Sequence, residues 1–493
     1  MKKCIALILV LMLCFALCAC GESADTQPSQ SESDMPHEHS YTSIVTPPTC
    51  TEKGYTTYTC ACGKSYTADQ VDIADHDYQE TARVDATVED DGSVTHTCSF
   101  CGDSYCDILY ATGSIGLSYE LNADGSYTVV GLGTCTDSHV VIPQYYKDAK
   151  VTAIGRRAFY DCATITEITI PDTITEIGQQ VFYKSSSLHT VYNNSTYYNA
   201  ENKFLNVTNI KKIVFGGTYI PDGFCYNLTN IEEVVILDGV TSIGMNAFYG
   251  CSNLASIEIS KSVTTIWDQA FGGCDKLSSV YITDISAWCE IETSLFTNGA
   301  NPLVCGATLY LNGEEITELV IPEGVSKIGN YAFYGCDKLE RIEIPNTVTS
   351  IGSYAFCNCT NLKSAIFPDS IITINGGTFS CCSSLENIVI PDTVASIGYY
   401  AFYGCSSLTN LVIPDSVGTI DYYAFSDCVG LESITIPDSI TSIGEAVLAG
   451  CSNLAQLHFS GTTDQWNSIA KGSDWNLGIG NYTIYCIDGE ISK

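Results

Sequence analysis

Six cysteines in the C-terminal half of the chain recur at a constant interval of 23 residues. They are Cys336, Cys359, Cys382, Cys405, Cys428 and Cys451, and Cys251 and Cys274 share the same interval. The residues between them repeat as well, since IPDTVASIGYYAFYGCSSLTNLV (Ile390–Val412) is followed directly by IPDSVGTIDYYAFSDCVGLESIT. A fixed period in this range is typical of a solenoid of stacked units. We therefore expect a repeat architecture.

The apolar residues of one unit predict a single coil of this solenoid. In the coil that starts at Leu408 the inward positions are Leu408, Leu411, Ile413, Val417, Ile420, Ala424, Phe425 and Cys428. Leu411 and Ile413 predict a strand, and Val417 and Ile420 a second extended segment after the Pro414-Asp415 turn. The last three predict one helical turn. We expect a β-rich solenoid with parallel strands about 4.8 Å apart. One coil buries too little to fold alone, so the array is the folding unit.

The repeat resembles that of a known family. L-x-x-I-x-I-P-x-x-V-x-x-I-G-x-x-A-F-x-x-C is similar to the leucine-rich repeat of BspA-like bacterial surface proteins. Leu117–Pro143 resembles that family's N-terminal cap, Thr283–Glu292 with the following NPLVCGATLYLNGEEITELVIPEGV its internal interruption, and FSGTTDQWNSIAKGSDWN with YTIYC its closing cap. The resemblance extends from about Tyr110 to the C-terminus. It implies a non-catalytic surface scaffold that binds a protein or glycan, for example in adhesion to a host.

The N-terminus predicts export and lipid anchoring. Met1-Lys2-Lys3 precedes the apolar run Cys4–Ala19, which suits a signal peptide, and Leu17–Cys20 resembles a lipobox with Cys20 as the lipid-bearing residue. A plain cleaved signal or an uncleaved anchor is the alternative. The predicted parts are a signal peptide and lipobox (1–20), a tether (21–35), two Cys/His modules (36–106), an N-terminal cap (107–142), the solenoid (143–459, interrupted near 283–310) and a C-terminal cap (460–493).

The charge of the chain limits its partners. Its 21 Lys and Arg residues stand against 56 Asp and Glu residues, which gives a formal net charge of −35. Such a surface repels nucleic-acid backbones and anionic membrane surfaces. We therefore expect no nucleic-acid partner, and membrane association only through the lipid anchor.

The region 36–106 has the residues of a structural metal site. Tetrahedral zinc takes four nitrogen or sulfur ligands, and a turn such as Cys98-x-x-Cys101 supplies two of them. Alignment of the two modules places Thr87 opposite Cys50. The sequence predicts one zinc site per module, with disulfides or idle thiols as alternatives. The two predicted ligand sets are His39, Cys50, Cys60 and Cys62, and His76, His96, Cys98 and Cys101.

The repeat cysteines are predicted to be buried thiols. Cysteines one coil apart point the same way, whereas disulfide geometry requires converging Cβ vectors. They would then act as small hydrophobic residues, with intercoil disulfides as the alternative. Cys357 and Cys381 lie off the repeat position, and we expect them to be exposed. The solenoid itself requires no cofactor.

The chain lacks the motifs of common enzymes. It has no G-x-S-x-G, H-E-x-x-H or P-loop sequence, and the solenoid with its caps contains only His139, His189 and His458. We therefore predict a binding protein, with a structural envelope component that has no dedicated ligand as the alternative.

Two rows of residues are candidate binding surfaces. Ile366, Val389 and Val412 occupy one outward strand position, where β-propensity alone is the alternative explanation. Tyr331, Tyr354, Tyr400 and Tyr423 occupy one position near the helical turn, interrupted by Gly377, and their rings are expected to stack. Simple covering of the turns beneath is the alternative for the tyrosines. Asp369, Asp392, Asp415 and Asp438 form an acidic row that we interpret as solvated turn residues rather than a calcium site.

Overall fold

The computed structural model describes residues 40–88, 90–196, 209–293 and 299–492. The predicted signal peptide with Cys20, the tether and His39 lie outside the described residues. Within the described ranges, no helix has the length and apolar character that a membrane span requires. The chain divides into two compact units. The first contains the residues up to Thr81 together with His96–Tyr105, and the second contains Ala82–Thr95 together with Cys106–Lys493.

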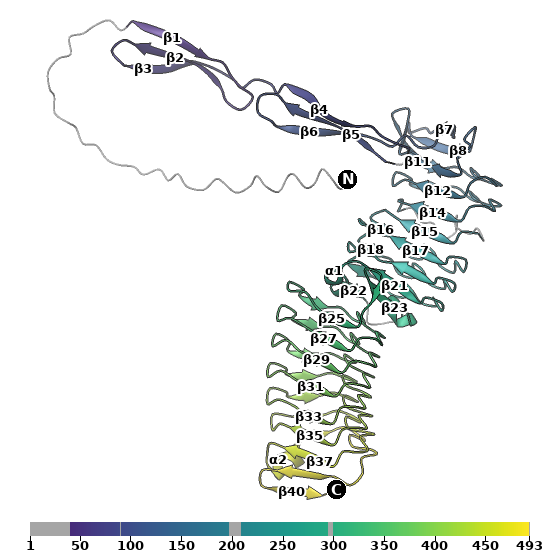
Figure 1. Ribbon diagram of the computed structural model, residues 1–493, viewed down its shortest axis with the longest axis vertical. Coiled ribbons are helices and arrows are strands. Elements are labelled where there is room, and N and C mark those ends of the chain that lie inside the picture. Colours follow the sequence, from purple (N-terminus) through teal and green to yellow (C-terminus); the bar gives the residue numbers. More distant parts are fainter. Residues whose placement is uncertain (1–39, 89, 197–208, 294–298, 493) are drawn as a thin grey trace, which may run out of the picture. The chain divides into compact units, whose positions relative to one another are not determined.

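Two small three-stranded sheets form the region before the solenoid (Figure 1). The Thr- and Tyr-rich sequences favour extended structure. In each sheet the middle strand in space is also the middle strand in sequence. The strands are β1 (Tyr41–Thr46), β2 (Gly54–Cys60) and β3 (Ser65–Val71) in one sheet, and β4 (Tyr78–Val84), β5 (Gly92–Cys98) and β6 (Ser104–Leu109) in the other.

A cap of four strands precedes the stacked coils of the second unit. β7 (Ser118–Leu121) pairs antiparallel with β8 (Tyr127–Gly131), and β10 (Tyr145–Tyr146) pairs antiparallel with β11 (Ala149–Ile154). Because β11 also pairs in parallel with β8 and with β13 (Glu176–Ile177), the cap leads directly into the stacked coils.

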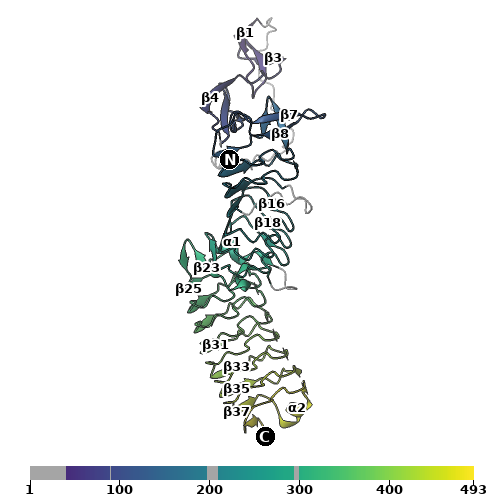
Figure 2. The same cartoon turned by 90° about the vertical axis from the view of Figure 1, so that its right-hand side faces the viewer.

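Each coil then adds one strand to a first parallel ladder, visible along the solenoid in Figures 1 and 2. In the regular coils, partners across this ladder are 23 residues apart, as in Ile366 opposite Val389, so the sequence period becomes the register. The strands are β9 (His139–Val141), β12 (Glu167–Ile170), β14 (Thr190–Asn193), β15 (Lys212–Phe215), β17 (Glu233–Ile236), β19 (Ser256–Glu258), β21 (Ser279–Ile282), β23 (Thr308–Leu311), β25 (Glu318–Val320), β27 (Arg341–Glu343), β29 (Ser364–Ile366), β31 (Asn387–Val389), β33 (Asn410–Val412), β35 (Ser433–Ile436), β37 (Gln456–Phe459) and β39 (Thr483–Cys486).

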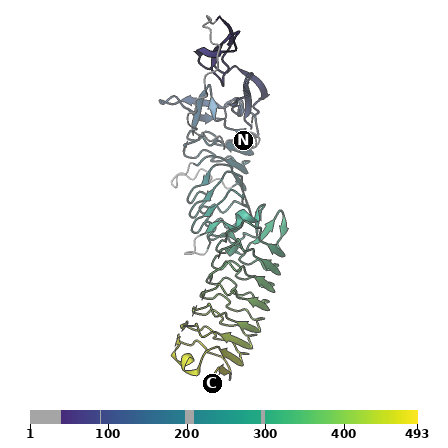
Figure 3. The same cartoon turned by 90° about the vertical axis from the view of Figure 1, so that its left-hand side faces the viewer.

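The second extended segment of each coil pairs with that of neighbouring coils in a second parallel ladder. Figure 3 shows the stacked coils from the side opposite to Figure 2. Each strand of the second ladder is two residues long, and all except β38 bury the second residue, as Ile397 and Ile420 show. Its strands after β13 are β16 (Tyr219–Ile220), β18 (Ser242–Ile243), β20 (Thr265–Ile266), β22 (Glu292–Thr293), β26 (Lys327–Ile328), β28 (Ser350–Ile351), β30 (Thr373–Ile374), β32 (Ser396–Ile397), β34 (Thr419–Ile420), β36 (Ser442–Ile443) and β38 (Ala470–Lys471). The predicted solenoid of stacked parallel strands is confirmed.

The predicted helical turns form a third row of contacts between coils. The backbone N–H of Phe379 donates to the carbonyl of Ala401 at 2.8 Å, and that of Phe402 donates to the carbonyl of Ala424 at 2.8 Å. The phenyl rings of successive coils stack with centroids 5.3–5.8 Å apart, and each ring is fully buried. The stacked rings are Phe333, Phe356, Phe379, Phe402 and Phe425.

The cysteines at the 23-residue interval face the core, as predicted, and those from Cys359 to Cys451 also donate a hydrogen bond. The Sγ of Cys382 lies 3.1 Å from the carbonyl oxygen of Phe356, and the Sγ of Cys428 lies 3.1 Å from that of Phe402. Each acceptor belongs to the preceding coil, where it also accepts the backbone N–H of that coil's own cysteine. The thiol therefore acts as a polar link between coils as well as a small apolar side chain.

The ladder is interrupted where the sequence pattern lapses. β23 folds back on β24 (Glu314–Glu315) as an antiparallel hairpin, and a new sheet starts at β25. α1 (Ile285–Cys289) joins the two parts, because the buried Trp288 donates its Nε1–H to the carbonyl of Ala332 at 2.7 Å. The 3-10 helix η2 (Pro302–Cys305) also replaces a coil contact, since the Sγ of Cys305 bonds the carbonyl of Phe271 at 3.2 Å.

The last coil is closed by α2 (Thr463–Ser468) and β40 (Gly489–Ser492). Thr462 and Gln465 form a capping box at the start of α2, and Trp466 is buried on its inner side. β40 pairs antiparallel with β39 and so covers the edge of the first ladder.

The buried cysteines generate a labelling prediction. Burial raises the pKa of Cys336 and Cys451 to about 12, so both remain protonated thiols at neutral pH. We expect the six cysteines from Cys336 to Cys451 at the 23-residue interval to react with iodoacetamide roughly 1,000-fold more slowly than exposed Cys106, since exposure requires unfolding. Peptide mass spectrometry before and after denaturation measures this. Equal rates for Cys106 and the six would contradict their placement.

Candidate binding surface and candidate metal centre

The tyrosine position in the repeat has a left-handed backbone. Tyr331, Tyr354, Tyr400 and Tyr423 have φ values of 53–58°, and Gly377 at the same position has a φ of 64°. Residues other than glycine adopt this conformation at a cost of about 1–2 kcal/mol. Glycine at this position is therefore locally favourable, whereas tyrosine needs compensating contacts from its ring.

The rings provide those contacts by stacking between coils. Tyr331 and Tyr354 stack with centroids 5.2 Å apart, and Tyr400 and Tyr423 stack at 4.9 Å. A second pair, Tyr399 and Tyr422, stacks at 5.3 Å. The predicted stacking of the tyrosine row is therefore confirmed. The sequence pattern gave no sign that the neighbouring column, which holds Tyr399 and Tyr422, also takes part.

The gap at Gly377 is filled by neighbouring rings. A Cβ placed on Gly377 would lie 2.3 Å from the ring of Tyr354, and one placed on Gly376 would lie 2.3 Å from the ring of Tyr399. These two rings meet edge to face, with centroids 6.2 Å apart. Six rings thus form one continuous surface, called here the tyrosine cluster: Tyr331, Tyr354, Tyr399, Tyr400, Tyr422 and Tyr423.

Exposure differs along the tyrosine cluster. Tyr331 is only 8% exposed, whereas Tyr422 is 40% exposed. Tyr354, Tyr399, Tyr400 and Tyr423 are half-buried. Packing is therefore the main role of Tyr331, and the end of the cluster that contains Tyr399 and Tyr422 is the part that a partner can reach.

A shallow groove runs beside this accessible end. It has a volume of about 560 Å³, and Tyr399 forms part of its wall. Its floor is the second ladder, where Thr373, Ser396, Thr419 and Ser442 present hydroxyl groups to solvent from β30, β32, β34 and β36. Asn375 and Asp421 add an amide and a carboxylate. The groove therefore combines a polar floor with an aromatic wall.

The other predicted row lies on a different face. Ile366, Val389 and Val412 are 51%, 80% and 65% exposed on β29, β31 and β33. Val320 on β25 extends this row, which we call the strand-face stripe, and Glu343 on β27 interrupts it. None of these residues lines the groove beside the tyrosine cluster. The stripe is thus an apolar strip on an open sheet.

The acidic row and the extra cysteines complete the predicted sites of the solenoid. Asp369, Asp392, Asp415 and Asp438 are exposed, and the described residues do not gather them into a set of metal ligands. The expectation that Cys357 and Cys381 are exposed is wrong for Cys357, which is 6% exposed, while Cys381 is half-buried. Cys357 follows Phe356 directly, and this part of the turn packs against the next coil.

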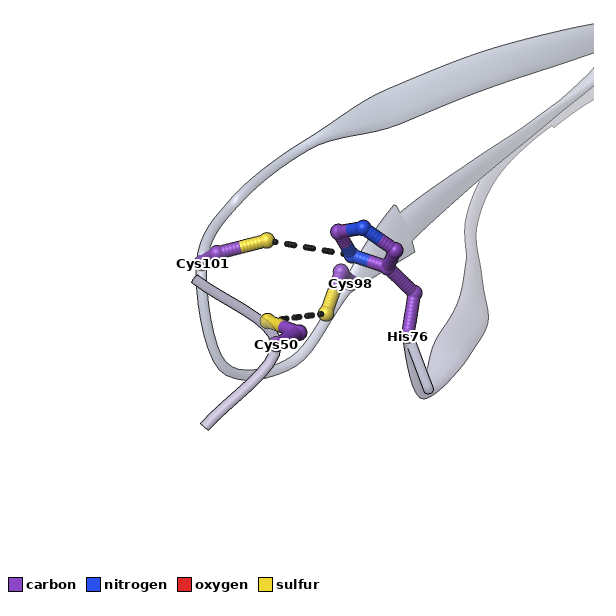
Figure 4. A group of neighbouring side chains, drawn as sticks. All are labelled: Cys50, His76, Cys98 and Cys101. Atoms are coloured by element: carbon purple, nitrogen blue, oxygen red, sulfur yellow. Dashed lines mark hydrogen bonds between the residues drawn. The ribbon is translucent and has the colours of Figure 1, made fainter. Parts of the chain in front are cut away.

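A cluster of three cysteines and one histidine lies in the first unit (Figure 4). It contains Cys50 from the loop between β1 and β2, His76 from the segment before β4, Cys98 from the end of β5, and Cys101 from the turn after β5. The Sγ atoms of Cys50 and Cys98 are 3.7 Å apart, and the Sγ of Cys101 is 3.4 Å from the Nδ1 of His76. All four ligand atoms lie within 4.8 Å of one another.

Close contact between these groups changes their acidity. The side-chain hydrogen bond with Cys101 is the main cause that raises the pKa of Cys50 to about 12, and burial adds to it. For Cys98, burial acts to raise the pKa, but backbone N–H groups of Cys101 and Phe100 act against it and the pKa falls to about 6. The cluster therefore favours a thiolate at Cys98 beside a protonated thiol at Cys50.

The structure groups the Cys/His residues differently from the two predicted sets. Cys50 comes from the first set, and it joins His76, Cys98 and Cys101 from the second. Cys60 is buried at the end of β2 and Cys62 is exposed in the following turn, while the ring of His96 stacks on Tyr105 at 4.9 Å. The correction has a physical reason. Each module is incomplete alone, because Thr87 replaces Cys50 in the second and Cys60-x-Cys62 is a tighter turn than Cys98-x-x-Cys101 in the first.

Comparison with known families identifies the repeats. The family described as "BspA type Leucine rich repeat region (6 copies)" matches residues 138–218, 218–302, 306–391 and 374–477. The chain belongs to this BspA-type leucine-rich repeat family. The tyrosine cluster and the groove lie inside the matched BspA-type repeats, and the Cys/His cluster lies before them.

Several solved structures are similar to this BspA-type chain. A leucine-rich repeat protein from Bacteroides ovatus is 27% identical, with a TM-score of 0.40, over 76% of this chain and 98% of its own. A leucine-rich cell surface protein from Faecalibacterium prausnitzii is 25% identical, with a TM-score of 0.36, over 73% and 97%. A leucine-rich repeat protein from Eubacterium ventriosum is 24% identical, with a TM-score of 0.35, over 67% and 91%. Comparison with curated proteins gave no match.

The packing at Gly377 generates a stability prediction for the BspA-type repeats. We expect Gly377→Ala to destabilise the chain by about 1–3 kcal/mol beyond the left-handed backbone cost, because the new Cβ overlaps the ring of Tyr354. Gly404→Ala is the matched control. Its φ is 68°, but its Cβ would meet atoms only at 3.8 Å, so it should lose about 1 kcal/mol. Urea unfolding measures both, and equal losses would show that the ring does not occupy the gap.

Proposed function

We propose that this chain is a non-catalytic cell-surface protein that binds a protein or glycan partner through the groove beside the tyrosine cluster. The observation that supports this most is the combination of a polar groove floor on the second ladder with the aromatic wall at Tyr399. The rings are already packed on one another, so a partner that uses them loses little conformational entropy on binding.

A neutral glycan suits this groove best. Sugar rings present C–H groups that pack on aromatic faces and hydroxyl groups that bond to polar side chains. The floor offers the hydroxyls of Thr373, Ser396, Thr419 and Ser442 along successive coils. A repeating row of this kind matches a chain of repeating sugars. The net charge of −35 and Asp421 in the groove disfavour an acidic polysaccharide.

The surface location in this proposal is supported by the N-terminal sequence. The apolar run Cys4–Ala19 and the lipobox-like Leu17–Cys20 favour an exported chain anchored through Cys20. Family membership supports a repeat scaffold that presents a binding face. A structural envelope component without a dedicated ligand is the second candidate.

The non-catalytic part of the proposal is supported by the histidines of the solenoid. His139 bonds Thr169, His189 bonds Thr190 and His458 bonds Gln456, each through a ring nitrogen. These contacts lie on separate coils and none lines the groove. We interpret them as structural contacts of the scaffold, because they lie outside the groove.

The proposal predicts which variants lose a partner. The purified chain, tested on arrays of neutral glycans, mucins and matrix proteins, should bind at least one glycan. The double variant Tyr399→Ser/Tyr422→Ser should weaken this binding at least about 10-fold, because aromatic anchors each contribute roughly 1 kcal/mol or more. Its melting temperature reports any loss of stacking separately.

The strand-face stripe supplies the matched control. Val389→Ser/Val412→Ser changes two exposed residues on another face and should leave glycan binding unchanged. Loss of binding only in this control would move the site to the stripe and favour an extended polypeptide partner. A chain that retains only copies of itself would favour the structural envelope role.

A further inference from the structure

We propose that Cys50, His76, Cys98 and Cys101 hold one zinc ion that joins the two Cys/His modules. The distances between the side chains match a zinc coordination sphere. Zinc–sulfur bonds of about 2.3 Å and zinc–nitrogen bonds of about 2.0–2.1 Å at tetrahedral angles place sulfur atoms about 3.8 Å apart and sulfur and nitrogen about 3.6 Å apart. The corresponding distances are 3.7 Å for Cys50 and Cys98 and 3.4 Å for Cys101 and His76.

The same distances argue against a disulfide. A disulfide requires sulfur atoms about 2.05 Å apart and joins cysteines in pairs. Here all four ligand atoms lie within 4.8 Å of one another, so they converge on a common centre (Figure 4). The ligands also come from three separate chain segments, namely the loop with Cys50, the segment with His76 and the turn that holds Cys98 and Cys101. Such convergence orders several loops at once, which a metal achieves with a single ion.

The first unit has little else to stabilise it. Among the described residues of this unit, the buried hydrophobic residues are Cys50, Cys60 and Cys98. Strand β1 is exposed along its whole length, and β3 is exposed at six of its seven positions. Sheets with so small a core usually need a metal or disulfides to fold. Two of the few buried residues, Cys50 and Cys98, are themselves members of the cluster.

The ligand set indicates the metal and its role. Three thiolates and one imidazole in a tetrahedral arrangement are typical of structural zinc. Four protein ligands fill the coordination sphere and leave no position for substrate or water, so the ion stabilises structure. Because Cys50 belongs to the first module and Cys98 and Cys101 to the second, binding couples the folding of both.

Metal analysis of the full chain tests this proposal. The chain, purified under reducing conditions with trace zinc, should contain about one zinc per molecule as measured by inductively coupled plasma mass spectrometry. Cys50→Ser and Cys101→Ser should each lose it. Cobalt replacement should give the visible absorption of a tetrahedral thiolate site. His76→Cys should keep the metal and strengthen the sulfur-to-cobalt band, a result that unfolding of the module cannot produce.

The remaining Cys/His residues supply matched controls. Cys62→Ser and His96→Ala should retain the zinc, because neither side chain belongs to the cluster. Two zinc ions per chain, with one lost in Cys62→Ser and the other in His96→Ala, would overturn the shared site in favour of one site per module. A metal-free folded chain with Cys50 and Cys98 in a disulfide would overturn the metal site itself.

Discussion

Hydrogen bonding between coils is the constraint on which the solenoid depends. Each coil meets the next in three rows, namely the first ladder, the second ladder and the helical turns. All three rows require the same rise per coil, so an insertion in one coil disturbs every row at that point. The thiol-to-carbonyl bond adds a fourth link, as between Cys405 and Phe379, where the sulfur lies 3.3 Å from the oxygen. This is why the cysteine interval is so regular, since a side chain that bonds the neighbouring coil cannot shift along it.

The core was predictable because each buried repeat position holds the same type of residue in successive coils. Leu411, Phe425 and Cys428 occupy positions that the spacing alone assigns to the interior, and all three are buried. The conformation of the turn was not predictable in this way. Tyr400 and Gly377 share a left-handed position although their side chains differ greatly, and only the backbone shows what they have in common. Cys357 was misplaced for the same reason, because its burial depends on how the next coil covers the turn.

The tyrosine cluster shows how a surface arises from neighbours that the repeat does not align. Tyr354 and Tyr399 belong to different repeat positions and to coils that are not adjacent in the sequence pattern. They meet because Gly376 and Gly377 leave room above the coil between them. When each repeat position is considered separately, Gly377 looks like an interruption of the tyrosine row. The structure has instead a larger aromatic surface that borders the groove, and this places the candidate site at the one coil where the tyrosine row lapses.

The two parts of the chain solve the problem of a small hydrophobic core in different ways. A coil of 23 residues buries its apolar residues only by stacking on other coils, so its stability grows with the number of repeats. There are only two Cys/His modules, so they cannot gain stability by extending an array. From the sequence, each module is predicted to hold a complete zinc site of its own. The loss of a cysteine at Thr87 leaves the second module short of a ligand, and Cys50 of the first module supplies it. Degeneration of one copy in a repeated pair is therefore itself a signal, because the residue that survives in the other copy is free to complete a site between them.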